Sequence, residues 1–183
     1  MRTLTPDREA RFRALYADAH ADVLRFAQRR VHRSHAEDVT ADAFLVAWRR
    51  LDDAPNKPDD VRAWLFGIAR HCLLNTLRGQ GRRDALAVRV AEAAPCARFA
   101  DGLDADPVAH RIDLAAAWRR LSETDQEALS LTVFEDLSSV QAARILGITA
   151  ASYRLRLLRA RRALRRQLDL AEFPSYVPME IQS

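Results

Sequence analysis

Arginine is concentrated in one short stretch of the sequence, AARILGITAASYRLRLLRARRALRR, which runs from Ala142 to Arg166. Between Ala150 and Arg166, seven of the seventeen residues are arginines and none is acidic. A guanidinium group can neutralise a phosphate and release its counterions, or form a bidentate pair with guanine in the major groove of DNA. DNA binding is therefore the chemistry that this stretch predicts, and a solvated basic helix is the alternative.

Two helices joined by a glycine turn would position these arginines. Ser138 with Gln141 three residues later is a capping-box pattern, which predicts the start of a short helix that ends at Leu146. Gly147 begins the turn, and Thr149 can cap the second helix. This is the helix-turn-helix arrangement, in which the second helix enters the major groove.

The second helix has two faces of different composition. One face is apolar at helical spacing and is expected to pack on the first helix. It consists of Tyr153, Leu157, Ala160 and Leu164. The opposite face is the one expected to contact DNA, and it carries Arg154, Leu155, Leu158, Arg159 and Arg162. Contact with thymine methyl groups would explain two leucines on a face that is otherwise basic.

Bulk composition is that of an ordinary globular protein. The chain has 183 residues, of which 49% are hydrophobic and 30% charged, and its net charge is +4. The apolar residues are mostly alanine and leucine, which favour helices, and no segment alternates with a period of two. We therefore expect an all-α protein.

Several classes of site and location are not supported by the sequence. Cys72 and Cys96 form no CxxC pair and no cluster with histidine, so we expect a reduced, intracellular chain without a zinc site. No apolar run approaches the ~20 residues of a membrane span, and the polar N-terminus is unlike a secretory signal. The five histidines are scattered. We predict a cytoplasmic protein with no membrane insertion, catalytic residue, metal, cofactor or small-molecule substrate.

The first 84 residues have the pattern of three helices. The second, at about 35–51, has Ser34 as a candidate N-cap and Glu37 three residues further on. The third, 61–78, ends at Gly79, and glycine is common just after the last turn of a helix.

The pattern changes after this segment. Residues 85–112 contain alanine, aspartate and proline with little periodicity, as is typical of a linker. Helical patterning returns over 113–170, where Ser122 can cap a helix with an acidic first turn. Residues 171–183 form a tail of unknown role. The sequence thus predicts two small helical domains, 1–84 and 113–170, that fold separately and are joined by a flexible linker.

Three stretches, in this order, resemble the extracytoplasmic-function (group 4) sigma factors of bacterial RNA polymerase. AEDVTADAFLVAWRRL, 36–51, is similar to the region 2 helix that docks on the polymerase clamp. VRAWLFGIARHCLLNTLRGQGRR, 61–83, is similar to the segment that melts the promoter and reads the −10 element. LSETDQEALSLTVFEDLSSVQAARILGITAASYRLRLLRARRAL, 121–164, is similar to region 4, which reads the −35 element. The resemblance implies a non-enzymatic subunit that binds core RNA polymerase and directs it to promoter DNA.

The resemblance also implies roles for particular residues. A docking stripe for polymerase would consist of Asp38, Asp42, Leu45 and Arg49, for which an ordinary solvated face is the alternative. The −10 set would capture an unstacked base and contact phosphates. It comprises Leu51, Ala54, Ile68, His71, Asn75, Arg78, Arg82 and Arg83. Arg70, His71, Asn75 and Arg78 are the residues of this segment that we expect to be exposed. His71 stands where the family often has asparagine, so it implies a different −10 preference, or it is a plain surface histidine.

Members of this family usually have an anti-sigma factor that blocks both domains, so the resemblance implies such a partner. It also implies association with the nucleoid when the chain is active. The acidic linker would be either a solvated tether or a segment that threads toward the RNA exit path. The alternative function is a helix-turn-helix activator whose N-terminal domain senses a ligand or dimerises. Against it, residues 1–84 are basic and contain no glycine-rich phosphate loop.

Overall fold

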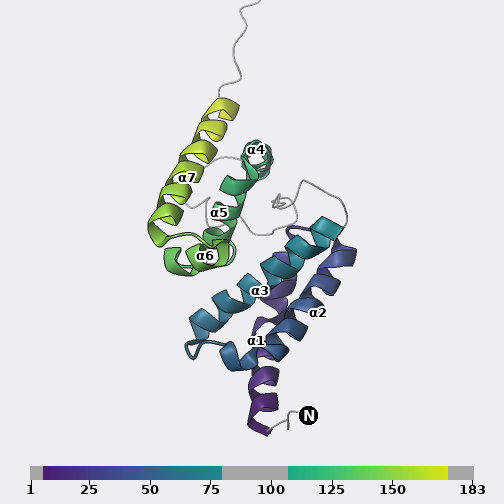
Figure 1. Cartoon of the computed structure of the whole chain (residues 1–183). Helices are drawn as coiled ribbons and strands as arrows, with labels where there is room; N and C mark the ends of the chain where they lie inside the picture. Colours follow the sequence, from purple (N-terminus) through teal and green to yellow (C-terminus); the bar gives the residue numbers. More distant parts are fainter. Residues whose placement is uncertain (1–5, 80–106, 173–183) are drawn as a thin grey trace, which may run out of the picture.

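The computed structural model describes residues 6–79 and 107–172 (Figure 1). Every regular element in these two ranges is helical, and they contain no strand, so the all-α prediction is confirmed. The elements are α1 (Pro6–Gln28), α2 (Arg33–Arg49), η1 (Leu51–Asp53), α3 (Pro58–Gly79), α4 (Pro107–Arg119), α5 (Glu123–Val133), α6 (Ser139–Leu146) and α7 (Ala150–Glu172).

The first bundle consists of α1, α2 and α3, each of which packs on the other two. Its core forms where the apolar stripes of the three helices meet, and Phe26, Val39 and Leu65 are almost fully buried there. The rings of Phe26 and Phe66 lie 5.3 Å apart between centroids. Burial of each such side chain contributes about 1.5–3 kcal/mol, so this apolar contact is what holds the bundle together.

The second bundle consists of α4 to α7, in which α7 packs on each of the other three helices. All four residues of the predicted core face of α7 are buried, which confirms that prediction. Tyr153 is fully buried, and its hydroxyl donates to the carbonyl oxygen of Ala128 at 2.7 Å. Burial raises the pKa of Tyr153 and so keeps this donor protonated.

The helix boundaries follow local capping chemistry. Ser122 accepts a hydrogen bond from the backbone of Asp125, as predicted. The prediction of Ser34 as the N-cap of α2 is wrong: the cap is His32, which is extended and accepts from the backbone N–H of Ser34. A ring nitrogen is an acceptor that the serine-based capping rule does not consider. α4 begins at Pro107, inside the segment assigned to the linker, and proline suits the first turn of a helix.

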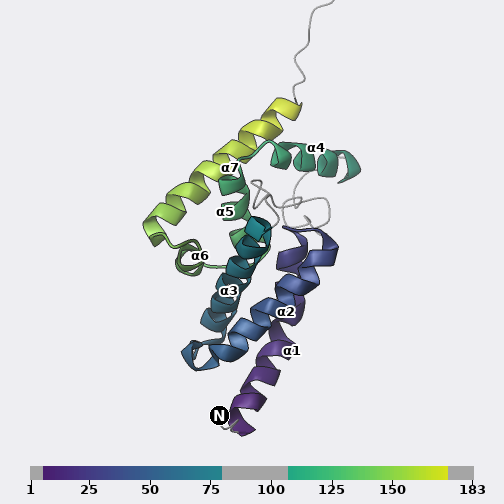
Figure 2. The same ribbon diagram turned by 45° about the vertical axis from the view of Figure 1, so that its right-hand side comes forward.

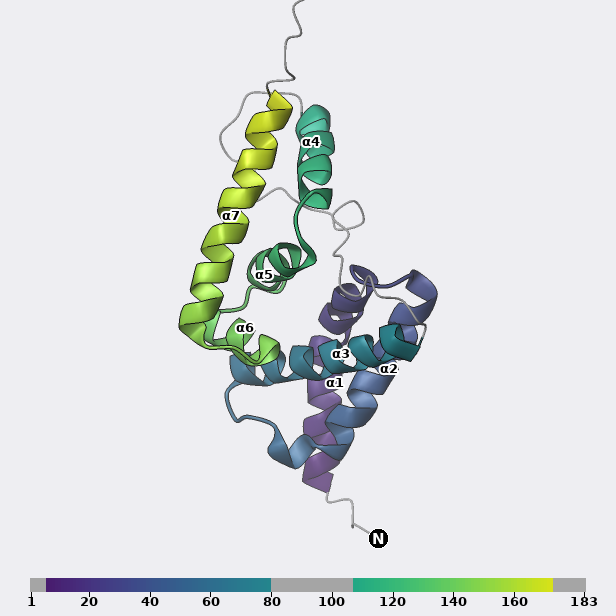
Figure 3. The ribbon, with the colours of Figure 1, turned by 45° about the horizontal axis from the view of Figure 1, so that its top comes forward.

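The two bundles lie against each other through α3 and α6. Both rotated views keep α6 beside α3 (Figures 2 and 3). The sequence did not predict this contact, and the separate folding of the two domains stays a prediction. Within residues 6–79 and 107–172, no helix is long and apolar enough to cross a membrane.

Candidate nucleic-acid interface

The turn between α6 and α7 is built from the residues that the sequence singled out. Ser138 and Gln141 form a reciprocal capping box at the start of α6. Gly147 ends that helix in the left-handed conformation, at φ 67°, and its N–H donates to the last turn. The hydroxyl of Thr149 accepts from the backbone of Ser152 at 3.1 Å, which caps α7. All the parts of the predicted helix-turn-helix are therefore present.

The outer face of α7 is open to solvent. Leu155 and Leu158 are 48% and 44% exposed, which is unusual for leucine beside buried neighbours. Arg154, Arg159 and Arg162 are exposed on the same face, and none of them forms an ion pair within the described ranges. Their charge is thus available for an anion, and the leucines beside them are available for an apolar contact.

Two further arginines extend this basic face. Arg165 and Arg166 line a surface hollow on α7 together with Arg159, Arg162 and Asp169. They follow the predicted DNA-contacting set at helical spacing, and that spacing could have identified them from the sequence. The basic surface is therefore one turn longer than predicted.

The −10 set gathers partly around one hollow. A cavity of about 260 Å³ lies between the η1–α3 loop, α3 and α6, lined by Pro55, Ile68 and His71 of the first bundle and by Arg144 and Ile145 of α6, among others. His71, Asn75 and Arg78 are exposed and follow each other along one face of α3. Arg82 lies outside the described residues, and so does Arg83.

Two members of the −10 set lie deeper than a base-contacting role would need. Leu51 is 1% exposed and Ala54 is 9% exposed, so both support the loop from beneath. Ile68 is also buried, although it lines the hollow. Of these three residues only Ile68 lines the hollow with His71, and the roles of all three in DNA binding stay predictions.

The predicted docking stripe lies on the outer face of α2. Asp38, Asp42, Leu45 and Arg49 are all exposed, and Leu45 is 47% exposed. An aromatic cluster stands close to this helix: the ring of Tyr16 lies 4.7 Å from that of Phe44 and is 44% exposed. Tyr16 follows the apolar helical spacing of α1 but lies at the edge of the core, because periodicity alone does not locate that edge.

A buried ion-pair cluster joins the end of α1 to the second bundle. Arg30 is fully buried and pairs with Glu127 and Glu135, both at 3.4 Å. Its Nη2 donates to the hydroxyl of Ser130 at 2.8 Å. Arg29 pairs with Glu135 at 3.1 Å. The sequence missed this cluster, because its members are about a hundred residues apart in the chain.

Two arginines of α3 complete the cluster. Arg62 donates to the carbonyl oxygen of Glu135, and Arg70 lies 3.6 Å from Glu127. Arg70 was expected to be exposed on the −10 face, and that prediction is wrong because its side chain turns toward the second bundle. Burial raises the pKa of Glu135, and the Arg30 and Arg29 guanidiniums oppose this rise. The arginines thus compensate a carboxylate that burial disfavours.

The described residues also bear on two other kinds of site, a metal site and a reactive thiol. Within residues 6–79 and 107–172 no three His, Cys, Asp or Glu side chains gather to hold a metal ion. Cys72 is half-buried, and burial, together with the charge of Asp42, raises the pKa of its thiol. A raised pKa disfavours the reactive thiolate.

Two family models match the chain in the order of its two bundles. Residues 15–83 match Sigma-70 region 2, and residues 111–164 match Sigma-70 region 4. The first match covers α1 to α3, and the second covers the helix-turn-helix and the helices before it.

Similar proteins and structures agree with these matches. The chain is 32% identical over 162 residues to "ECF RNA polymerase sigma factor SigL" of Mycobacterium tuberculosis, covering 87% of this chain and 90% of the relative. It is 32% identical over 149 residues to "RNA polymerase sigma factor CnrH" of Cupriavidus metallidurans, covering 76% of each. The solved structure of CnrH in complex with the cytosolic domain of CnrY has a TM-score of 0.57 and 28% identity, covering 88% of this chain and 89% of that one. RpoE from Bartonella quintana, in complex with the anti-sigma factor NepR, shares the fold at a TM-score of 0.56 and 21% identity, with 91% and 99% covered.

Proposed function

The chain belongs to the extracytoplasmic-function sigma factors of the sigma-70 family, and from this premise we propose how its residues divide the work of transcription initiation. As a sigma factor it binds core RNA polymerase and directs initiation to particular promoters. We assign −35 reading to α7, −10 reading to α3 and the η1 loop, and polymerase docking to α2. The active chain would then be found at the nucleoid, bound to polymerase and promoter, and would itself carry out no catalysis.

The observation that carries the −35 assignment is the exposed face of α7. Arginines that form no ion pair within residues 6–79 and 107–172 stand there beside two exposed leucines, directly after a capped glycine turn. We propose that Arg154 and Arg159 reach base edges and that Arg162 contacts phosphate. Arginine reads guanine by a bidentate pair, while leucine can pack on a thymine methyl group.

The −10 assignment is supported by the hollow beside His71. The family opens DNA by capturing an unstacked base, and the cavity beside His71 offers the apolar groups of Pro55 and Ile68 together with the charged groups of Arg50, Asp60 and Arg144. Unstacking a base costs free energy that its binding must offset. Asn75 and Arg78 continue along the same face and are placed to hold the adjoining backbone.

We propose that the docking stripe on α2, which is exposed along its length, binds core polymerase. Asp42→Arg should weaken binding to core polymerase by about tenfold, because it places a like charge against a basic partner surface. Glu37→Arg is the matched control, since Glu37 is exposed on the same helix but is not part of the stripe. Equal core affinity of the two variants in a pull-down titration would remove the docking role from this face.

We also propose an anti-sigma factor as a partner of this chain. In one similar structure, RpoE is bound to the anti-sigma factor NepR. In another, CnrH is bound to the cytosolic domain of CnrY. Co-purification of the tagged chain from its own cells, followed by identification of a stoichiometric partner, tests this point. Recovery of core polymerase alone would contradict it.

Run-off transcription tests the function as a whole. Core polymerase from the source organism, a fragmented genomic library and the purified chain should yield a small set of transcripts that depend on the chain. Polymerase without the chain is the control. Transcripts that do not change on addition of the chain would contradict the proposal. The match of residues 15–83 to region 2 argues against the alternative function, a helix-turn-helix activator with an N-terminal sensor domain.

A further inference from the structure

We propose that the outer face of α7 recognises the C5-methyl group of pyrimidines through Leu155 and Leu158, and that it therefore accepts 5-methylcytosine in place of thymine in its DNA site. This role rests on the proposed −35 reading by the same helix. It makes cytosine methylation a determinant of which promoters the chain binds.

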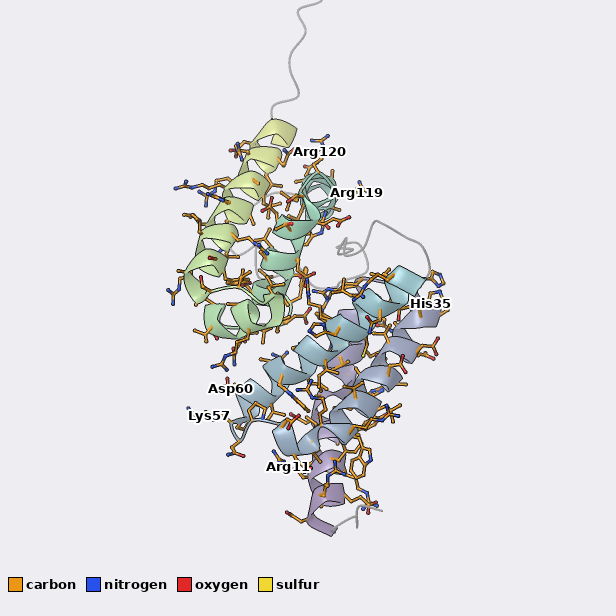
Figure 4. All side chains as sticks on the ribbon, viewed as in Figure 1. Arg11, His35, Lys57, Asp60, Arg119 and Arg120 are labelled. Carbon is orange, nitrogen blue, oxygen red and sulfur yellow. The ribbon has the colours of Figure 1, made fainter. Side chains whose placement is uncertain are left out.

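The outermost line of α7 changes in composition along the helix. With steps of four, three and four residues, this line consists of Ala151, Leu155, Leu158 and Arg162. All four residues are exposed. In Figure 4, side chains project from α7 on the side away from α5 and from Arg119 of α4. The line is thus apolar near the start of the helix and basic further along.

The apolar part is the one that meets base edges in this motif. In a helix-turn-helix, the N-terminal residues of the second helix contact the bases of the major groove. α7 begins at Ala150, so Leu155 and Leu158 lie within its first three turns. The basic residues at the end of the line come later and are left for the phosphates.

Each of the two leucines has an arginine beside it, one turn away. Arg154 and Leu158 are four residues apart, and so are Leu155 and Arg159. These arginines form no ion pair within the two described ranges, so a partner must offer negative charge next to an apolar group. The major groove offers both, because phosphates flank it and a thymine methyl group projects into it.

The exposure of the leucines points to the same partner. Leu155 and Leu158 are 48% and 44% exposed, and they adjoin each other on one line of the helix. Contact with a methyl group would remove apolar surface from water on both sides of the interface. A second copy of this chain is a poor occupant, because the arginines of one copy would face those of the other.

Leucine detects a methyl group without identifying the base that carries it. Its side chain has no hydrogen-bonding group, so it cannot distinguish the O4 acceptor of thymine from the N4 donor of cytosine. It responds only to the group on C5. Cytosine methylated at C5 carries the same group at the same place on the ring. Methylation should therefore improve binding to a C·G pair at a position where the chain prefers thymine.

The first test removes single methyl groups from the DNA. Full-length chain with core polymerase is bound to a promoter identified by run-off transcription. Each thymine of the −35 element, on either strand, is replaced in turn by deoxyuridine. At one or two positions the affinity should fall about fourfold, which corresponds to about 0.8 kcal/mol for one buried methyl group.

Two failures of this test are distinguishable. A complex that forms on the promoter but binds every deoxyuridine variant equally would overturn methyl reading and leave the −35 role of α7 in place. A complex that forms on no promoter would overturn the proposed function, and this role with it.

The second test separates contact with the methyl group from an effect of that group on DNA shape. Leu155→Ala or Leu158→Ala should bind thymine and deoxyuridine equally at a position found in the first test, because the methyl group then has no partner. Val140→Ala is the matched control, since Val140 is 45% exposed in the same motif but belongs to α6. It should keep the fourfold difference.

The leucine variants are expected to fold, because both positions are exposed and alanine favours helix. Circular dichroism should show unchanged helix content in all three variants. If both leucine variants keep the full difference between thymine and deoxyuridine, the role is overturned. Weaker binding to core polymerase with that difference intact would assign the leucines to a protein contact instead.

The third test adds a methyl group. The same position is changed from T·A to C·G, with the cytosine either unmethylated or methylated at C5. The unsubstituted chain should bind the methylated site about fourfold more tightly. The leucine variant that no longer distinguishes thymine from deoxyuridine should bind the two cytosine sites equally. Equal binding of both sites by the unsubstituted chain would overturn the acceptance of 5-methylcytosine.

Discussion

Arginines occupy two contrasting environments in this chain. On the outer face of α7, Arg154, Arg159 and Arg162 are exposed and form no ion pair within residues 6–79 and 107–172. At the junction of the bundles, Arg30 is buried and Arg29 is half-buried against glutamates of α5 and the loop that follows it. The same side chain therefore serves to bind an external anion in one place and an internal one in the other. The two roles differ in whether the fold brings a carboxylate close to the guanidinium group.

The difference has a consequence for energetics. An exposed, unpaired guanidinium contributes little to folding but retains its full charge for DNA. A buried, paired guanidinium contributes to the folded arrangement and is unavailable to a ligand, because its partners occupy its donors. Substitutions at the two sets should therefore affect different measurements.

The largest effect is expected at the junction. Arg30→Ala should lower the free energy of unfolding by up to about 3–5 kcal/mol, because it leaves Glu127 and Glu135 buried with fewer countercharges. The measurement is urea unfolding followed by circular dichroism. Arg25→Ala is the control: Arg25 forms an exposed pair with Asp22, and its loss should cost no more than about 1 kcal/mol. A similar cost for the two variants would erase the distinction between the two environments.

A smaller and sequence-dependent effect is expected at the front of the DNA face. Arg154→Ala should weaken binding to a promoter identified by run-off transcription by roughly 1–3 kcal/mol, and relax the preference at one or two base pairs. The measurement is binding to that promoter and to its single-base variants. If affinity falls with every base preference intact, Arg154 contacts phosphate and the proposed orientation of α7 in the groove is wrong.

The smallest effect is expected further along the same helix. Arg162→Ala should weaken binding to all sequences alike and reduce the slope of log K against log salt by about one phosphate contact. Titrations at several salt concentrations, on promoter and on unrelated DNA, measure this slope. The thermal stability of the Arg162→Ala variant should match that of the unsubstituted chain, whereas the stability of the Arg30→Ala variant should be lower. A change in base preference would instead make Arg162 a reader.

Most of the helix-turn-helix could be predicted from the sequence, because its determinants are local. The capping box at Ser138 and the left-handed turn at Gly147 depend on neighbours a few residues away. The alternation of buried and exposed positions along α7 follows from helical spacing. The prediction of the N-cap of α2 was wrong for an equally local reason, because His32 supplies an acceptor that the serine-based rule does not consider.

The rest depended on contacts between residues far apart in the chain. Periodicity placed Arg70 on an exposed face of α3, yet it turns toward Glu127 of the second bundle. Tyr16 shares the apolar spacing of α1, yet the residue is 44% exposed at the edge of the first bundle. Neither outcome is visible in a window of one helix, because each depends on which other helix lies opposite.

The sequence by itself determined the helical elements, the turn motif, the family and the two faces of α7, since each follows from residue spacing or from motifs in one segment. Only the tertiary structure decided which arginines are free. Arg30 and Arg154 carry the same guanidinium group. Arg30 is buried and paired because folding brings Glu127 and Glu135 to it from about a hundred residues away in the sequence. Coulombic pairing is set by distance in space, and sequence separation does not encode that distance.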